Sequence, residues 1–349
     1  MSRFSFRSAR TARLSLLFLL ILILAAACSS GGTASSSASS APPSAGASSA
    51  APASSAPSEP SEPAASAASY PLHLVDDDGT ALTLPAEPQR IVSLTPAETE
   101  ILFAIGAGDR VVGKVEDIAN YPPEAADVPV MGRFDGVDVE QIIAADADLV
   151  FAGGNGGTPP ESIEQLRSLG IPVLVVYAES VDKDLDDIEL IASAVGQPAE
   201  GKALVAEMRE KFDQVAAATA DLEKPRVFME TGNQPAIYGI ADDSVYAEMV
   251  ELAGGQPITT GSATNWEMPI ERLVTEDPEI ILLADANYGV TAEEVTGRSG
   301  WDGITAVKEG AIHPIDDIIV TRPGPRLTDG LLELLSKIHP DVDAGVDGS

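Results

Sequence analysis

The side chains that most often carry out chemistry in proteins are few in this sequence and far apart. The only cysteine is Cys28, and the three histidines, His73, His313 and His339, are too widely spaced to form a metal-binding motif. The serine elbow G-x-S-x-G, the zinc motif H-E-x-x-H, the phosphate loop, and a G-x-G-x-x-G turn after the first predicted strand are all missing. We therefore expect a protein that is not an enzyme and holds no metal of its own. A hydrolase that uses carboxylates outside these motifs is the weaker alternative.

Cys28 is informative because of the segment before it. A basic stretch with four arginines leads into an uncharged run over residues 14–27, which is typical of an export signal and short for a membrane-spanning helix of about 20 residues. The junction Leu24-Ala-Ala-Ala-Cys28 resembles the lipobox of bacterial lipoproteins, although its leucine lies one place early. We expect a signal peptide over residues 1–27 and a lipidated Cys28. An ordinary secreted protein is the alternative.

A segment of low complexity follows, over residues 28–69. Beyond the cysteine it consists almost wholly of Ser, Ala, Pro and Gly, and Glu59 and Glu62 are its only charges. Such a segment has no large apolar side chains to bury, so it cannot offset the entropy lost on ordering. The sequence therefore predicts a flexible tether that holds a folded body at the outer face of the cell membrane.

The net charge limits the partners of this body. The 349 residues include 54 acidic and 21 basic ones, for a formal charge of -33, and 44% are apolar. This length and composition suit two ordinary domains with their own cores. Binding to nucleic acid is excluded, because phosphates would be repelled, and docking of the folded surface on anionic lipid is disfavoured.

An internal repeat indicates how the body is built. Residues 137–152 align without gaps on residues 268–283, and each copy reads as a short helix, a turn and a continuously apolar strand. Short buried strands that alternate with helices are typical of a parallel sheet covered on both faces. We expect two α/β lobes, over residues 70–181 and 224–341, and a short tail over residues 342–349.

Between the lobes, residues 182–223 lack strand character. Apolar residues recur there at helical spacing, with a break at Gly196 and Pro198. The second piece, residues 199–222, would form a helix roughly 35 Å long at 1.5 Å per residue. This pattern predicts a rigid helical spine between the lobes, and a helix packed on one lobe only is the alternative.

Four segments carry a resemblance to a known family. They are residues 88–113, 120–125, 322–331 and 338–340, with sequences such as Pro88-Gln-Arg-Ile-Val-Ser-Leu-Thr-Pro and Arg322-Pro-Gly-Pro-Arg-Leu. In order and spacing they resemble the substrate-binding proteins of ABC importers for cobalamin and iron-siderophore complexes. The resemblance implies two Rossmann-like lobes joined by a single long rigid helix, and delivery of a large ligand to a permease dimer with its ATPase. We expect a monomer with no covalently bound cofactor.

The same resemblance gives a role to two repeated glutamates. In the family, one acidic residue on each lobe docks against arginines of the two permease subunits, and the matching positions are Glu140 and Glu271. Two like charges on a pair of related lobes can meet a two-fold partner and steer its approach. Solvated helix charges are the alternative.

The ligand is expected between the lobes, at the carboxyl ends of the strands, where open α/β sheets form crevices. Phe134 matches the place of an aromatic contact in cobalamin-binding relatives, with a core position as its alternative. The predicted ligand-binding residues of the first lobe are Pro96, Ile118, Tyr121, Arg133, Phe134 and Asn155. Those of the second are Asn233, Tyr238, Trp266, Asn287 and Arg322.

The expected cations and aromatic residues bear on the choice of ligand. Trianionic catecholate siderophores need several cations, and the expected crevice offers two, Arg133 and Arg322. Arg326 is expected to contact other parts of the protein and not the ligand. A broad and nearly neutral corrinoid, which carries cobalt, needs aromatic and aliphatic walls with scattered amides. Cobalamin or a related corrinoid is therefore the first choice. A ferric hydroxamate siderophore and heme remain open alternatives.

Overall fold

The computed structural model describes residues 69–133 and 136–346. The predicted signal peptide, Cys28 and the predicted tether as far as residue 68 lie outside these residues, and so does Phe134. No helix in the described ranges has both the length and the apolar character needed to cross a membrane. The described chain opens with an antiparallel hairpin of β1 (Leu72–Val75) and β2 (Ala81–Leu84).

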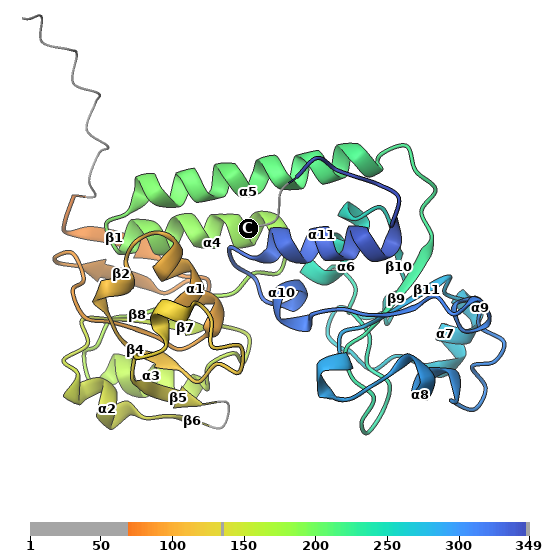
Figure 1. The fold of residues 1–349 in the computed structure, drawn as a ribbon. Helices are drawn as coiled ribbons and strands as arrows, with labels where there is room; N and C mark the ends of the chain where they lie inside the picture. Colours follow the sequence, from red (N-terminus) through yellow and green to blue (C-terminus); the bar gives the residue numbers. More distant parts are fainter. Residues whose placement is uncertain (1–68, 134–135, 347–349) are drawn as a thin grey trace, which may run out of the picture. The chain divides into compact units, whose positions relative to one another are not determined.

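The first large sheet has six strands in the order β6-β5-β4-β3-β7-β8 (Figure 1). Its pairings are parallel, apart from the antiparallel edge pair β5 and β6. The strands are β3 (Ile91–Ser93), β4 (Val111–Val115), β5 (Val130–Arg133), β6 (Gly136–Val137), β7 (Leu149–Gly153) and β8 (Val173–Val176). The helices between them are α1 (Pro96–Ala104), α2 (Val139–Ala144) and α3 (Pro160–Ser168).

The second sheet has four parallel strands in the order β10-β9-β11-β12. The strands are β9 (Arg226–Glu230), β10 (Gln256–Pro257), β11 (Ile280–Leu283) and β12 (Ile312–Pro314). The helices that follow β9 are α6 (Val245–Leu252), α7 (Ile270–Glu276), α8 (Ala292–Thr296), α9 (Thr305–Glu309), α10 (Asp317–Thr321) and α11 (Leu327–Ile338). The expected α/β class, with parallel sheets and alternating helices, is confirmed.

Both sheets are buried on two faces, which explains their continuously apolar strands. Along β7, Leu149 and Phe151 join one hydrophobic cluster, while Val150 joins another on the opposite face. Along β9, Val227 belongs to the first of these clusters and Phe228 to a third. Because successive strand residues point to opposite faces, an unbroken apolar strand must be covered by helices on both sides.

The internal repeat is present in the structure. The aligned segments form α2 followed by β7 in one case, and α7 followed by β11 in the other. Both turns contain an aspartate with a left-handed backbone, Asp146 at φ 48° and Asp277 at φ 47°. The Nε–H groups of Arg90 and Arg226 donate to the carbonyls of these turns, to Ala145 and to Glu276 respectively.

The connection between the two sheets consists of two helices. α4 (Val181–Ala194) follows β8, and α5 (Pro198–Thr219) leads on to β9. The two pack against each other, and the break between them falls at Gly196, whose φ is 75°. The expectation of a single connecting helix is therefore not confirmed, because two helices connect the sheets. α5 is the long helix, with 22 residues, and α4 contributes residues to the cavity described next.

Candidate functional site

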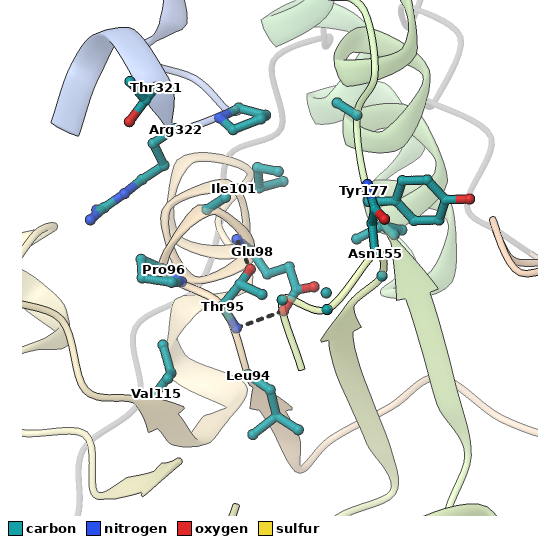
Figure 2. A pocket seen from close by; sticks show the side chains of 18 of the residues that line it. Leu94, Thr95, Pro96, Glu98, Ile101, Val115, Asn155, Tyr177, Thr321 and Arg322 are labelled. Atoms are coloured by element: carbon teal, nitrogen blue, oxygen red, sulfur yellow. Dashed lines mark hydrogen bonds between the residues drawn. The ribbon is translucent and has the colours of Figure 1, made fainter. Parts of the chain in front are cut away.

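A cavity of about 700 Å³ lies at the carboxyl ends of the first sheet's parallel strands (Figure 2). Leu94 follows β3, Glu116 follows β4, Gly153 ends β7 and Tyr177 follows β8, and all four residues line it. Later parts of the chain add Tyr246, Tyr288 and five residues between positions 317 and 323 to the wall. The volume lies within the range of small-molecule sites, so the crevice expected from the strand order is present.

The first turn of α1 forms one side of the cavity, and its sequence fixes that geometry. Thr95 is the N-cap, Pro96 occupies the first helical turn, and Glu98 completes a capping box. The Thr95 side chain accepts from Glu98 N at 3.3 Å, and Glu98 Oε2 accepts from Thr95 N at 3.0 Å. This reciprocal cap satisfies two backbone donors and orients the Glu98 carboxyl group.

Gly153 allows the strand end to approach this helix closely. A Cβ atom at this position would lie 2.5 Å from Thr95 Cγ2, which is closer than two carbon atoms can pack. The glycine loop that follows carries Asn155 into the lining with a left-handed backbone at φ 52°. Close packing at the cavity therefore requires the glycine that ends β7.

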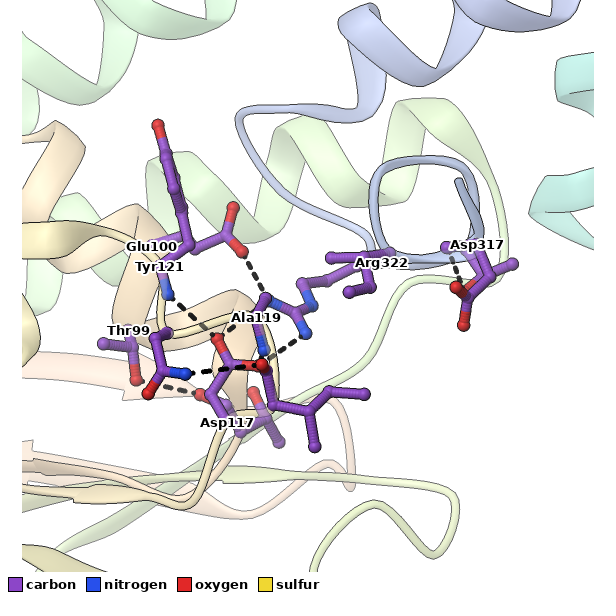
Figure 3. A network of polar contacts seen from close by, with 12 residues as sticks. Thr99, Glu100, Asp117, Ala119, Tyr121, Asp317 and Arg322 are labelled. Atoms are coloured by element: carbon purple, nitrogen blue, oxygen red, sulfur yellow. Dashed lines mark hydrogen bonds and ion pairs between the residues drawn. The ribbon is translucent and has the colours of Figure 1, made fainter. Parts of the chain in front are cut away.

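Arg322 lines the cavity, but its guanidinium is already engaged (Figure 3). It donates from Nη1 to Glu100 Oε1 at 2.6 Å and from Nη2 to Asp117 Oδ1 at 2.9 Å. Burial opposes the ionisation of Asp117, but hydrogen bonds from Arg322 and from the Ala119 N–H prevail and lower its pKa. The charge of Arg322 is thus balanced by two buried carboxylates.

Arg326 shares this network from the next turn of the chain. Its Nε and Nη2 donate to Glu100 at 2.9 and 2.7 Å, and its Cζ lies 3.8 Å from the centre of the Tyr121 ring. A guanidinium held between a carboxylate and an aromatic face is a structural pairing. This agrees with the expectation that Arg326 contacts other parts of the protein and not the ligand.

Arg133 is the second cation of the lining. It pairs with Glu116, from Nη1 to Oε1 at 2.6 Å, and both side chains are more than half exposed. Among the lining residues that the structure describes, Arg133 and Arg322 are the only cations. Both are therefore matched by carboxylates of the same chain.

Three buried carboxyl groups also belong to the lining. Glu98 comes from α1, and Asp184 and Asp187 lie one turn apart on α4. Burial raises the pKa of Glu98 to about 8 and that of Asp184 to about 8. Burial also raises the pKa of Asp187 to about 7, although Lys183 pairs with it and favours its charged form. The site is consequently neutral to acidic.

Five of the predicted ligand-binding residues line the cavity. They are Pro96, Ile118, Arg133, Asn155 and Arg322. Ile118 is 70% exposed, which is unusual for a large apolar side chain and places it at the rim. The strand-end reasoning therefore identified part of the wall from each half of the chain.

The other predicted residues lie elsewhere, except Phe134, which is outside the described residues. Tyr121 lies against the guanidinium of Arg326, and the exposed Asn287 donates from Nδ2 to the cavity-lining Asp317 at 2.6 Å. Trp266 packs edge-on against the cavity-lining Tyr246, with ring centres 5.6 Å apart, and is not itself a lining residue. Tyr238 pairs by its backbone with Gly232 and Glu267. Asn233 lines a separate surface hollow of about 630 Å³.

Sequence reasoning missed most of the acidic and tyrosine parts of the lining. The missed side chains with polar atoms are Glu98, Glu116, Asp184, Asp187, Tyr177, Tyr246 and Asp317. The polar positions Asp184 and Asp187 of α4 look like an ordinary solvated face, because Leu185 and Ile188 beside them carry the apolar pattern. The signal that was available is the capping box at Thr95, which places Glu98 at a strand end.

The repeated glutamates lie apart from this cavity. Glu140 is in the first turn of α2 and Glu271 in the first turn of α7, and both are exposed. Each borders its own surface hollow, of about 590 Å³ for Glu140 and about 630 Å³ for Glu271. Neither side chain has an ion-pair partner within the described ranges.

A ligand-sized cavity at the strand ends of an α/β fold is typical of a small-molecule binding protein. A sequence family described as "Periplasmic binding protein" matches residues 91–318. The chain therefore belongs to the periplasmic binding protein family. This confirms the resemblance seen in the sequence, and the relatives are substrate-binding proteins rather than enzymes.

Individual relatives and a solved structure are also similar to this chain over most of its length. The ABC transporter substrate-binding lipoprotein YvrC of Bacillus subtilis (strain 168), itself uncharacterized, is 34% identical over 279 residues, covering 78% of this chain and 87% of YvrC. A vitamin B12-binding protein of Vibrio parahaemolyticus is 26% identical, covering 73% of this chain and 91% of that protein. The periplasmic heme-binding protein RhuT from Roseiflexus sp. RS-1, in its apo form, superposes with a TM-score of 0.62 at 26% identity, covering 72% and 98%.

Proposed function

We propose that this protein captures a corrinoid, cobalamin or a close relative, and hands it to the permease of an ABC importer. In this proposal the cavity at the strand ends receives the ligand, and Pro96, Ile118, Asn155 and the tyrosines form its wall. A relative that shares most of its length with this chain is a vitamin B12-binding protein, which supports the ligand class.

The observation that carries the choice of ligand is the pairing of the cavity's cations. Arg322 is balanced by Glu100 and Asp117, and Arg133 by Glu116, so neither offers an uncompensated positive charge. A trianionic catecholate would meet this neutral to acidic wall without the cations that it needs. A nearly neutral ligand with apolar edges and amide groups meets no such penalty.

Two alternatives differ in how they suit the same wall. A ferric hydroxamate has little negative charge and remains the closest alternative. Heme carries carboxylates and requires an axial ligand, for which the described lining offers tyrosines such as Tyr288. Burial and then the charge of Asp317 raise the pKa of Tyr288, which disfavours the phenolate form. Heme is therefore the less suited of the two.

Two surface glutamates and the N-terminal segment are proposed to bring the loaded protein to the permease. We infer that Glu140 and Glu271 dock against the permease subunits, since both are exposed and lack ion-pair partners within the described chain. We also infer that a lipid on Cys28 keeps the body at the outer face of the membrane, in line with the lipoprotein among its relatives. The remaining component is an ATPase that drives the permease.

Titration of the purified protein with candidate ligands tests the proposal. Cyanocobalamin, a ferric hydroxamate, a ferric catecholate and heme are added separately while tryptophan fluorescence is recorded. Trp266 contacts the cavity-lining Tyr246, so a bound ligand is expected to change the signal. We expect saturable binding of cyanocobalamin and much weaker binding of the catecholate. If cyanocobalamin gives no saturable signal and another probe binds tightly, the corrinoid proposal is wrong and that other probe represents the ligand class.

A further inference from the structure

The turn between β1 and β2 reaches the outer edge of the first sheet. β8 is the last strand of that sheet, and on its free side Val175 O accepts from Asp77 N at 3.0 Å, while Val175 N donates to Asp76 Oδ2 at 3.3 Å. Two residues later, the N–H of Tyr177 donates to Asp77 Oδ2 at 2.8 Å. An open sheet edge invites pairing with other chains, so cover for the edge of β8 accounts for the backbone contacts of this turn.

Asp76 anchors the turn, and its contacts are structural. Its side chain is fully buried, and Oδ2 accepts from Arg167 Nη2 at 2.6 Å. Oδ1 accepts from Thr80 N at 2.7 Å, within the turn itself. None of these partners, Val175 included, lines the cavity. Asp76 therefore holds the hairpin on the lobe without contacting the ligand site.

Asp77, the next residue, contacts the residues that form the cavity wall. Its Oδ2 accepts from Tyr177 N, and Tyr177 lines the cavity. Its Oδ1 accepts from Lys183 Nζ at 2.6 Å, and Lys183 also pairs with the lining residue Asp187. The Asp77 side chain is only 9% exposed, and charge-assisted hydrogen bonds of this kind hold their partners in one geometry. The carboxylate thus joins the end of β8 to the first turn of α4.

Tyr177 in turn sets the position of the glycine loop after β7. A Cβ atom on Gly154 would lie 2.0 Å from Cδ1 of the Tyr177 ring, so the ring lies directly against the loop backbone. Gly154 N also donates to Val176 O at 3.0 Å, and the next residue, Asn155, lines the cavity. Figure 2 shows Tyr177 beside the loop that carries Asn155. A shift of Tyr177 would therefore move a second part of the wall.

We propose that Asp77 is a positioning residue of the ligand site. From the hairpin it fixes Tyr177 directly and Asp187 through Lys183, so that this side of the cavity is formed before the ligand arrives. A wall that is already ordered lowers the entropy lost on binding. The inference rests on the proposed function, because it assigns the ligand to this cavity.

Four variants test the positioning role. Asp77→Ala removes both contacts of the carboxylate and leaves the backbone pairing with Val175 in place. Asp76→Ala is the matched control, because it makes the same change in charge in the same turn and its side-chain partners lie outside the lining. If Asp76→Ala does not fold, Arg167→Gln replaces it and removes the same ion pair from the other side. Asp77→Asn is the conservative variant, since its amide oxygen still accepts from Tyr177 N.

Each variant is titrated with cyanocobalamin, a ferric hydroxamate, a ferric catecholate and heme, and its melting temperature is recorded. We expect Asp77→Ala to weaken binding of the probe that the wild type prefers by about fivefold or more, because the ligand must then order the wall. Asp76→Ala should lower the melting temperature at least as much, since its carboxylate is fully buried, and should keep the affinity within about twofold. Asp77→Asn should recover part of the affinity that Asp77→Ala loses.

A measurement without ligand separates this inference from the proposed function. In Asp77→Ala the amide of Tyr177 loses its acceptor, and its hydrogen exchange, followed by NMR, should be about tenfold faster or more. If the wild type binds a probe and Asp77→Ala binds it equally well, or the control loses as much affinity, the positioning role is wrong while the binding function stands. If the wild type binds no probe, the proposed function falls. Unchanged exchange at Tyr177 would then overturn the positioning role too, and faster exchange would support it.

Discussion

Asp285 is a buried carboxyl group whose two oxygens both lack hydrogen-bond partners within the described chain. It is 3% exposed. The neighbouring Glu230 is fully buried and takes both guanidinium nitrogens of Arg298, at 2.5 and 2.7 Å. Burial, followed by the charge of Glu230, raises the pKa of Asp285 to about 7. Ionisation of Asp285 therefore opposes folding.

The variant Asp285→Asn should stabilise the protein more at pH 8 than at pH 5. An unfolded aspartate titrates near 3.9, so the contribution of a raised pKa is fully present below about pH 4 and is lost as the pH rises through about 7. Asparagine does not titrate, so the advantage of the variant grows with pH, by on the order of 1 to 3 kcal/mol. Urea unfolding at the two pH values measures this difference.

Asp302→Asn is the matched control, because Asp302 is an exposed aspartate of the same chain. Its effect on unfolding free energy should be small and nearly the same at pH 5 and pH 8. An Asp285→Asn variant with a pH dependence equal to that of the wild type would show that Asp285 does not titrate in this range.

The contacts of individual residues were the least predictable feature from the sequence. Strand-end logic placed Pro96 and Arg322 in the cavity, because the carboxyl ends of parallel strands meet at one edge. It could not reveal that Arg322 is neutralised by Glu100 and Asp117, which lie more than 200 positions earlier in the chain. Such pairings depend on tertiary packing, which leaves no local periodicity in the sequence.

At the scale of elements, α2 and α7 present equivalent surfaces. Each carries its glutamate in the first turn, Glu140 or Glu271, where the helix dipole favours negative charge. Three residues later, each also carries an exposed apolar side chain, Ile143 at 45% exposure and Val274 at 41%. Residues three apart share one helix face, so acidic and apolar groups recur together in both copies. This recurrence supports a common role for the two helices in docking.

Charge reversal at both positions, Glu140→Lys with Glu271→Lys, is expected to reduce ligand uptake at least tenfold in cells. The physical reason is that steering and pairing with arginines of the partner depend on the sign of the charge. Ligand affinity of the purified variant should stay within twofold of wild type, because neither residue lines the cavity. Uptake of labelled ligand and a binding titration measure the two quantities.

A double variant of equal charge change serves as the control, Glu164→Lys with Glu293→Lys. These exposed glutamates lie on α3 and α8, outside the two docking helices. Their reversal should leave uptake close to the wild-type rate. Normal uptake by the Glu140 and Glu271 variant, or an equal loss in the control, would remove the case for docking at these helices.

The elements themselves were largely predictable, for a physical reason. The ungapped repeat predicted a helix, a turn and a buried strand in each copy. Both turn aspartates adopt the left-handed backbone that a tight turn requires. The inward role of α4 was not predictable. Its polar positions Asp184 and Asp187 fall between the apolar ones as on any surface helix, and only the tertiary packing around α4 buries them.

At the scale of the whole molecule, one continuous hydrophobic cluster contains side chains from both large sheets. Phe151 of the first sheet and Met229 of the second belong to it, with Ile188 of α4, Met208 of α5 and Leu331 of α11. A shared core of this kind favours unfolding of the body as one cooperative unit. The cavity is built wholly from residues 94–323 of this body. Ligand binding should therefore be independent of the N-terminal segment.

Cys28→Ala tests the division of labour between that segment and the body. If Cys28 carries the lipid, its loss removes the buried acyl chains that hold the protein on the bilayer, and the variant is expected in the soluble extracytoplasmic fraction. Cyanocobalamin affinity should remain within twofold of wild type, because every residue of the cavity is retained. Ser29→Ala is the control and should stay with the membranes. Fractionation of cells that express each variant, followed by titration of the purified proteins, measures both quantities. Membrane partitioning of Cys28→Ala equal to that of Ser29→Ala would refute the anchor, while a loss of affinity would show that the N-terminal segment takes part in binding.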